Sequence, residues 1–141
     1  MPGHRLLGHD CADLLDLVAP IRLARAALEV LPEGGFIVQV SAVVAEKPMP
    51  GMAAHGAAKA ALTAFDAALA TELRRRRIRV LDVRPPHTET GLATRPVAGE
   101  APRLPEGLAP EAVAERLIRA LVGDERDVPS AAFTAAPPTP S

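Results

Sequence analysis

Aromatic residues and cysteines are scarce in this chain, and both shortages exclude classes of function. The sequence contains no Trp, no Tyr and three Phe, so aromatics make up 2% of its 141 residues. Modules that bind single-stranded nucleic acid stack bases on aromatic side chains, so a module of this kind is not expected. The single cysteine, Cys11, excludes an internal disulfide and a cysteine-based zinc cage. The four histidines have no close spacing, and we expect no metal site.

Strong charge and long apolar runs are also missing. Sixteen basic and 17 acidic residues give a net charge of -1, so no global field would draw the chain onto nucleic acid or an anionic membrane. No apolar run reaches the length of about 18 residues that a membrane-spanning helix requires. Charged residues interrupt the N-terminal stretch where a signal peptide would be apolar. These features predict a cytoplasmic protein with no membrane partner.

What remains is a modest apolar core arranged as one α/β domain. Length favours a single domain, and apolar residues recur at helical spacing in some segments and as short β-branched runs in others. Pro20 is expected to kink or split the first helix, which Asp10 or Asp13 would cap. The expected elements are a helix over 13–31, a strand over 36–41 buried on both faces, an alanine-rich helix over 53–77, a strand over 78–83, a helix from Pro110 to Gly123 and a possible strand over 128–133.

This order predicts a parallel sheet of two to three strands with flanking helices. Residues 1–12 are expected to be irregular, residues 13–133 to form the domain and residues 134–141 to be a disordered tail. Gly34 and Gly35 precede the first strand, and residues 87–108 are rich in proline and glycine and predict a long loop.

Two stretches in a fixed order carry a family resemblance. The first reads FIVQVSAVVAEKPMPGMAAHGAAKAALTAF, and the second reads RVLDVRPPHTET. Together they resemble the serine strand, the Tyr-x-x-x-Lys helix and the Pro-Gly-x-x-x-Thr turn of the short-chain dehydrogenase/reductase family. The resemblance covers residues 16–133 and implies a truncated, Rossmann-like doubly wound sheet that corresponds to the C-terminal half of that family's domain.

The catalytic motif of the family is degenerate in this chain. Its Lys matches Lys59, but the position of its Tyr, the general acid/base, holds His55. The position of its Ser holds Ala42, with Ser41 one residue before, and the position of its Asn falls near Asp16. The residues that the resemblance implies for catalysis are therefore Lys59, His55 and Ser41.

The cofactor site that the resemblance implies is incomplete. Thr90 matches the turn threonine that touches the nicotinamide carboxamide, Lys59 matches the ribose-binding lysine, and Pro86 replaces a glycine. The glycine-rich turn that cradles the dinucleotide phosphates is not found, because Gly34 and Gly35 come before a strand rather than after one. We therefore expect no cofactor on this chain alone, and NAD(P) by family resemblance only.

Each candidate residue also has a purely structural interpretation. His55 and Lys59 could move a proton, or His55 could simply begin a helix beside an emptied pocket. Ser41 could bind a carbonyl, or it could end a strand by bonding to the backbone. The arginines at 74–77, 79 and 84 could bind phosphate, or they could be solvated side chains at the negative end of a helix dipole. We favour the structural interpretation in each case.

Two functional hypotheses follow. In the first, the chain is a degenerate family member without independent catalysis, stable as a homodimer or as a heterodimer with a complete relative through helices 13–31 and 53–77. In the second, it is an NAD(P)-dependent alcohol or ketone oxidoreductase, or part of one. It would then use His55 and Lys59 with a cofactor domain from a partner or from an upstream segment.

Overall fold

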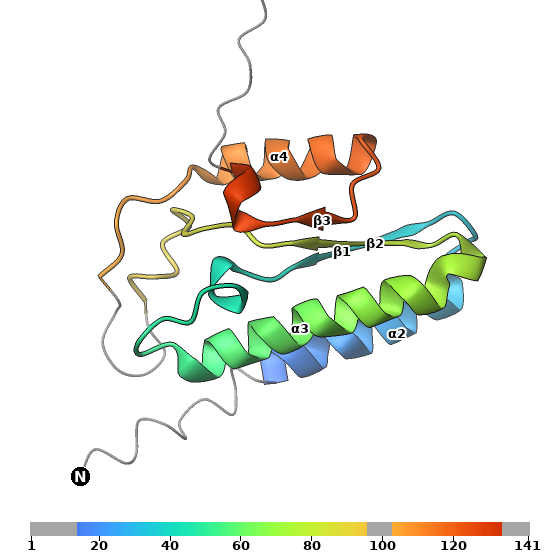
Figure 1. Ribbon diagram of the computed structural model, residues 1–141, viewed down its shortest axis with the longest axis horizontal. Coiled ribbons are helices and arrows are strands. Elements are labelled where there is room, and N and C mark those ends of the chain that lie inside the picture. Colours follow the sequence, from blue (N-terminus) through green and yellow to red (C-terminus); the bar gives the residue numbers. More distant parts are fainter. Residues whose placement is uncertain (1–13, 96–102, 134–141) are drawn as a thin grey trace, which may run out of the picture.

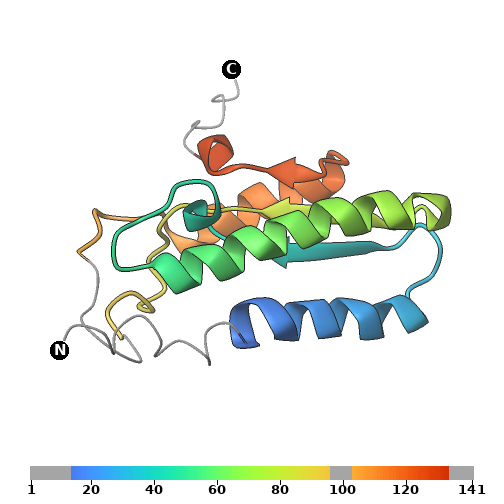
Figure 2. The ribbon, with the colours of Figure 1, turned by 60° about the horizontal axis from the view of Figure 1, so that its bottom comes forward.

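Helices cover both faces of a three-stranded sheet in the computed structural model, which describes residues 14–95 and 103–133 (Figures 1 and 2). Helices α2 and α3 lie side by side on one face, and α4 lies on the other. The elements are a π-helix Leu14–Val18, α2 Ala19–Val30, β1 Phe36–Val40, a 3-10 turn Val43–Ala45, α3 Ala53–Glu72, a 3-10 turn Leu73–Arg76, β2 Arg79–Val83, α4 Pro110–Val122, β3 Asp127–Val128 and a 3-10 turn Ser130–Phe133. The predicted α/β class is confirmed. The expected N-terminal segment 1–12, the caps Asp10 and Asp13 and the tail 134–141 lie outside the described residues.

All strands run parallel in the order β1-β2-β3, so β2 is central and β1 forms an edge of this sheet. The prediction that the first strand is buried on both faces is wrong. Phe36 is 51% exposed and Val40 is 48% exposed, and the residues between them are only half-buried. The reason is that β1 has a neighbouring strand on one side only, whereas β2 has one on each side.

The third strand is shorter than its predicted range of 128–133. Pairing with β2 is limited to Asp127 and Val128, and a 3-10 turn then begins at Ser130. Pro129 has no N–H group with which to continue the ladder, so the strand ends before it.

Side chains of β2 alternate between two apolar clusters. On the α3 side, Ile78 and Val80 pack with three residues of the helices, Ala24, Leu69 and Leu73. On the α4 side, Leu81 and Val83 pack with Ala120 and Val128. Because successive side chains of a strand point to opposite faces, the short sequence RVLDV supplies both halves of the core. The same alternation places Asp82, like Val80, on the α3 side.

Asp66 on α3 is an acidic residue that is buried between α3 and the sheet. Its side chain hangs from α3 and is 2% exposed, and neither carboxylate oxygen has a hydrogen-bond partner among the described residues. Burial, and after it the nearby charge of Asp82, raise the pKa of Asp66, while the amide of Gln39 lowers it by less, and together they give a pKa of about 7. The protonated carboxyl is therefore the form that the fold favours.

This buried carboxyl predicts that stability falls as pH rises. Between the unfolded pKa of about 4 and the folded pKa of about 7, the native state holds a proton that the unfolded chain has lost. We expect the free energy of unfolding to fall by on the order of 2 kcal/mol from pH 5 to pH 8, measured by urea denaturation. Asp66→Asn has no proton to lose and is the control, so an equal pH dependence in both proteins would contradict the prediction.

Candidate functional site

Three polar side chains meet where the π-helix Leu14–Val18 contacts the start of α3. Asp16 Oδ2 lies 2.9 Å from His55 Nδ1, and Asp16 Oδ1 lies 3.2 Å from Lys59 Nζ. Lys59 Nζ also donates to the Val40 carbonyl oxygen over 3.4 Å. The exposed fractions of these side chains are 33% for His55, 27% for Asp16 and 13% for Lys59, so solvent reaches the cluster.

Local sequence explains how Asp16 reaches α3. Pro20 lies in the first turn of α2 and has no N–H group to donate to the carbonyl of Asp16 four residues before it. The chain is a wider π-helix over Leu14–Val18 and becomes an α-helix only from Ala19, which confirms that Pro20 splits the predicted helix. On α3, His55 and Lys59 are one turn apart and so share a face.

The arrangement can hold and orient an imidazole. A carboxylate bound to Nδ1 fixes the ring and its tautomer, which leaves Nε2 for a proton-transfer partner. Sequence reasoning put His55 and Lys59 together and placed Asp16 at the family's Asn position, but it did not find the contacts from one carboxylate to both. The available signal was Pro20, because an interior proline marks a departure from α-helical geometry.

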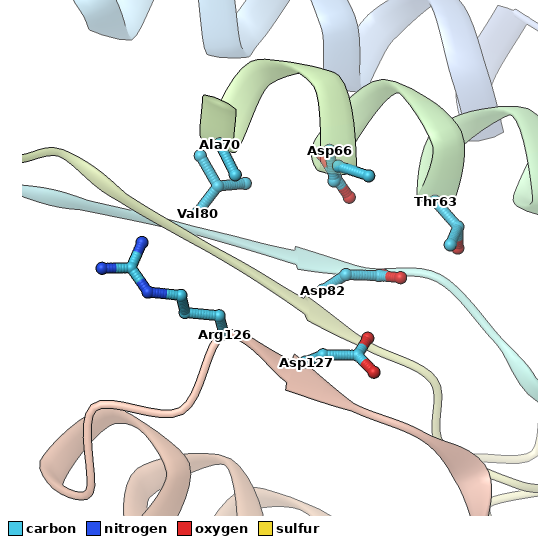
Figure 3. Close-up of a pocket in the computed structure, with 8 residues that line it drawn as sticks. Thr63, Asp66, Ala70, Val80, Asp82, Arg126 and Asp127 are labelled. Atoms are coloured by element: carbon cyan, nitrogen blue, oxygen red, sulfur yellow. The ribbon is translucent and has the colours of Figure 1, made fainter. Parts of the chain in front are cut away.

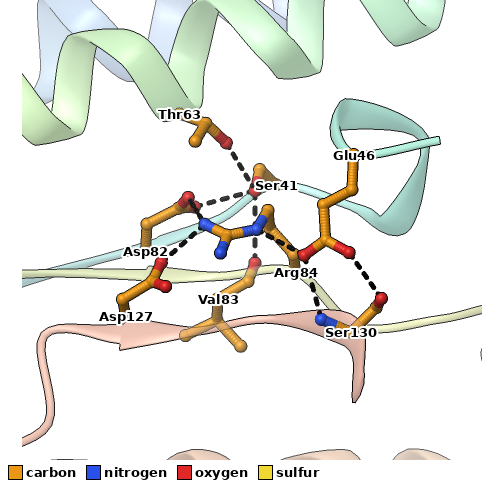
Figure 4. A network of polar contacts seen from close by, with 8 residues as sticks. All are labelled: Ser41, Glu46, Thr63, Asp82, Val83, Arg84, Asp127 and Ser130. Atoms are coloured by element: carbon orange, nitrogen blue, oxygen red, sulfur yellow. Dashed lines mark hydrogen bonds and ion pairs between the residues drawn. The ribbon is translucent and has the colours of Figure 1, made fainter. Parts of the chain in front are cut away.

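Ser41 does not join this cluster, because its hydroxyl is bound within the sheet layer (Figure 4). The side chain is 4% exposed, and its Oγ donates to Asp82 Oδ1 over 2.7 Å and accepts from Thr63 Oγ1 over 3.3 Å. Its backbone N–H donates to the Val83 carbonyl oxygen over 2.9 Å. These contacts agree with the structural interpretation of Ser41, in which it is a polar residue that ends a strand.

Arg84 is the centre of the network that holds Ser41 (Figure 4). Its guanidinium is bound to Asp82, lies 2.7 Å from Glu46 Oε1 and lies 2.7 Å from Asp127 Oδ1. These carboxylates, with Asp127 first, outweigh burial and raise the pKa of Arg84. The prediction that Arg84 belongs with a solvated basic cluster is wrong, because Arg84 is 8% exposed and fully paired. The missed signal was the pair of opposite charges at positions 82 and 84, at the end of β2 and just after it, which are two residues apart and so on one face.

Glu46 connects the same network to Ser130, in the 3-10 turn after β3. It accepts from the Ser130 N–H over 3.0 Å and from the Ser130 hydroxyl over 2.5 Å. Burial alone would raise the pKa of Glu46, but the hydrogen bonds from Ser130 and Arg84 lower it below its usual range. Glu46 therefore joins the loop after β1 to the turn after β3.

The predicted cofactor-contacting residue Thr90 lies apart, in the loop after β2. It is exposed, and its hydroxyl is 3.5 Å from the Leu92 N–H. Nearby, His87 Nε2 lies 3.1 Å from Glu89 Oε1, and Thr88 pairs with Leu108 as an isolated bridge. Within residues 14–95 and 103–133, the hydrogen bonds of Thr90 are to Leu92 and Thr88 and do not involve His55 or Lys59.

Residues 14–95 and 103–133 contain neither a cluster of potential metal ligands nor a helix that could cross a membrane. No group of three or more His, Cys, Asp or Glu side chains is placed to hold a metal ion. None of the helices there combines the length and apolar character that crossing a bilayer requires.

Comparison with known proteins identifies the family. A family profile described as enoyl-(acyl carrier protein) reductase matches residues 11–129. The chain belongs to the short-chain dehydrogenase/reductase family. An uncharacterized oxidoreductase of Methylorubrum extorquens is 37% identical over 86 residues, which cover 60% of this chain and 35% of the relative.

Solved short-chain dehydrogenases share the fold. One from Sphingobium yanoikuyae in complex with NADPH is 31% identical, with a TM-score of 0.71, over 81% of this chain and 45% of its own. Another from Burkholderia cenocepacia in complex with NADP is 25% identical, with a TM-score of 0.72, over 84% of this chain and 47% of its own. The chain thus spans about a third of the curated relative and under half of these structures.

The residues present do not fit a dinucleotide. At the start of α3, Gly56 packs against the 3-10 turn of this chain and not against open space, because an added Cβ there would lie 3.4 Å from the Val44 carbonyl oxygen. Lys59 is already bound to Asp16 and Val40, and Thr90 is on an exposed loop. No two glycines in the sequence are spaced as G-x-G, so the short-chain dehydrogenase/reductase pattern for holding a pyrophosphate is not met.

Removal of the central guanidinium should test whether the Ser41 network is structural. Arg84→Met leaves several carboxylates facing one another without a cation, and we expect a loss of about 3 kcal/mol in the free energy of unfolding. Arg75→Met is the matched control, since Arg75 is exposed and has no side-chain hydrogen bond or ion pair among the described residues. We expect that variant to stay within about 0.5 kcal/mol. Equal effects of the two substitutions in urea denaturation would count against the structural role.

Proposed function

We propose that these 141 residues form an oxidoreductase-like subunit that has no independent activity and acts by dimerising or by binding a partner. The observation that carries the proposal is the lack of any glycine-rich strand-to-helix turn for dinucleotide phosphates. Without such a turn, a nicotinamide cofactor loses most of its contacts. We place the subunit in the cytoplasm as part of the same proposal.

The catalytic positions support the absence of independent activity. His55 stands where the family has its acid/base tyrosine, and Ala42 stands where it has the serine that polarises the substrate carbonyl. The neighbouring Ser41 is buried and bound to Asp82, so its hydroxyl is not offered to a substrate. Lys59 is held by Asp16 and by the carbonyl of Val40.

Exposed apolar surface supports a partner. The side chain of Leu15 in the π-helix is 71% exposed, and those of Leu23 and Val30 on α2 are 70% and 82% exposed. The adjacent outer face of α3 is almost entirely alanine, so another helix can approach it closely. This α2–α3 surface is the one through which the family resemblance implies a dimer, with a second copy or with a complete family member. The β1 edge, with Phe36 and Val40 half-exposed, offers a second place for pairing.

A second function is favoured by the cluster at the start of α3. Asp16 orients His55 and contacts Lys59, which are the elements of an acid/base group. In this version the chain is an NAD(P)-dependent ketone or alcohol oxidoreductase, or part of one, and the cofactor is held by a partner or by an upstream segment. His55 would exchange the proton at the substrate oxygen, and Asp16 would hold the ring.

Cofactor titration of the purified chain tests the first function. We expect no saturable binding of NADH or NADPH in the micromolar range by isothermal calorimetry, because the phosphate contacts are missing. Saturable binding by the chain alone would contradict the proposal. NADPH binding and ketone reduction that arise only with a second chain carrying a glycine-rich turn, and that His55→Phe and Lys59→Ala remove, would instead establish the second function.

The partner surface predicts a concentration-dependent dimer that a charge on α2 disrupts. We expect Leu23→Glu to weaken the dimer at least about tenfold in sedimentation velocity, because a carboxylate would be buried in an apolar interface. Leu92→Glu makes the same change at a leucine that is 73% exposed and belongs to the loop after β2 rather than to α2 or α3, and it should leave the dimer unchanged. A wild-type chain that stays monomeric at every concentration would exclude the homodimer.

A further inference from the structure

A hollow of about 230 Å³ lies between α3 and the α3-facing side of the sheet, separate from the Asp16 cluster (Figure 3). Its walls include Ala67 and Ala70 of α3 and Val80 of β2, which are apolar. Three carboxylates, of Asp66, Asp82 and Asp127, line the same space. The volume exceeds the cavity of ~150 Å³ that holds a benzene molecule in an engineered protein. The hollow therefore has room for a small organic molecule.

Asp66 is the polar group in this hollow that lacks a partner. It is 2% exposed, and both of its carboxylate oxygens are without a hydrogen bond in the described structure. Figure 3 shows its carboxylate directed from α3 toward the sheet, on the side of Asp82. The amide of Gln39 on β1 does not line the hollow; it is near enough to Asp66 to lower the pKa of that carboxyl, but it does not complete a hydrogen bond to either oxygen. Buried polar groups in folded proteins are nearly always hydrogen-bonded, so the two unpartnered carboxylate oxygens of Asp66 beside this cavity point to a ligand with donors.

The charges around the hollow favour a cation. Asp82 and Asp127 share the guanidinium of Arg84, which also pairs with Glu46, so one positive charge faces several negative ones. Arg126 lines the far end of the hollow and is exposed, and Figure 3 shows its guanidinium pointing away from Asp66. An added positive charge beside Asp66 would therefore be attracted.

A metal ion fits this hollow less well than an organic cation. The described residues hold no group of three potential ligand side chains with suitable placement. Asp82 and Asp127 are already bound to Arg84, which leaves Asp66 as the carboxylate with free oxygens. A bare ion would make no favourable contact with the apolar walls, whereas a carbon chain would bury apolar surface against them.

We propose that this hollow is a binding site for a small primary alkylamine, whose ammonium group donates to Asp66 and whose carbon chain lies against Ala67, Ala70 and Val80. An ammonium has three donors, so it can satisfy both Asp66 oxygens. Nothing in this site depends on the proposed function of the subunit.

The pH dependence of binding follows from Asp66. Its pKa is raised to about 7 by burial and by Asp82, and the amine binds the ionised form. Asp82, Asp127 and Arg126 are the other charged groups that line the hollow, and Arg84 is bound to the first two of them. Affinity should therefore rise about tenfold or more from pH 6 to pH 8, while an alkylammonium of pKa near that of lysine, about 10.4, stays charged.

The test uses n-butylamine hydrochloride and the full chain at pH 8, followed by amide chemical shifts and thermal unfolding. We expect saturable shifts at residues that line the hollow and a raised Tm. Butan-1-ol, of the same length, and ammonium chloride, of the same ionic strength, should produce neither effect. Asp66→Asn should weaken binding at least tenfold and abolish its dependence on pH.

A second pair of variants keeps Asp66 and tests whether the hollow must be open for the amine to bind. Ala67 is exposed at the edge of the hollow, so Ala67→Leu should obstruct it and remove binding. Ala68→Leu adds the same side chain on the next residue of α3, which does not line the hollow, and should bind as the wild type does. No saturable response of the wild-type chain, an equal response to butan-1-ol, or unchanged binding by Ala67→Leu would each overturn the site.

Discussion

The buried guanidinium of Arg84 is the interaction on which the rest of this structure depends. It binds carboxylates from the loop after β1, from β2 and from β3, and Glu46 extends the contact to Ser130. A desolvated arginine is tolerated only where several acceptors surround it. The carboxyl ends of all three strands must therefore lie together at one end of the sheet.

That constraint also determines what Ser41 can do. Asp82 is bound to Arg84 and accepts the Ser41 hydroxyl, and Thr63 donates to the same oxygen. A hydroxyl with these partners belongs to the packing between α3 and the sheet. Chemistry at the start of α3 is left to His55 and Lys59, with Asp16 between them. The structure thus contains two polar groups of different kinds, one buried and structural, the other half-exposed and open to solvent.

Asp16, which contacts α3, and Asp66, which belongs to it, are both aspartates but lie in different surroundings. Asp16 faces a lysine and a histidine and is partly solvated. Asp66, on the helix itself, is buried without a partner and beside a second acid, so its pKa rises to about 7. Desolvation and the neighbouring charge, rather than residue type, raise the pKa of Asp66.

The sequence by itself determined the order of elements, the parallel sheet and the family. Periodicity, Pro20, Pro110 and the double proline after β2 are local signals, and a local signal reports the chain within a few residues. Burial and side-chain partners come from residues far apart in the chain. Only the tertiary structure decided that β1 is a half-exposed edge, that Ser41 and Arg84 are buried together, and that Asp16 meets His55 across 39 positions. Such contacts depend on how the layers pack, and no pattern within one segment encodes them.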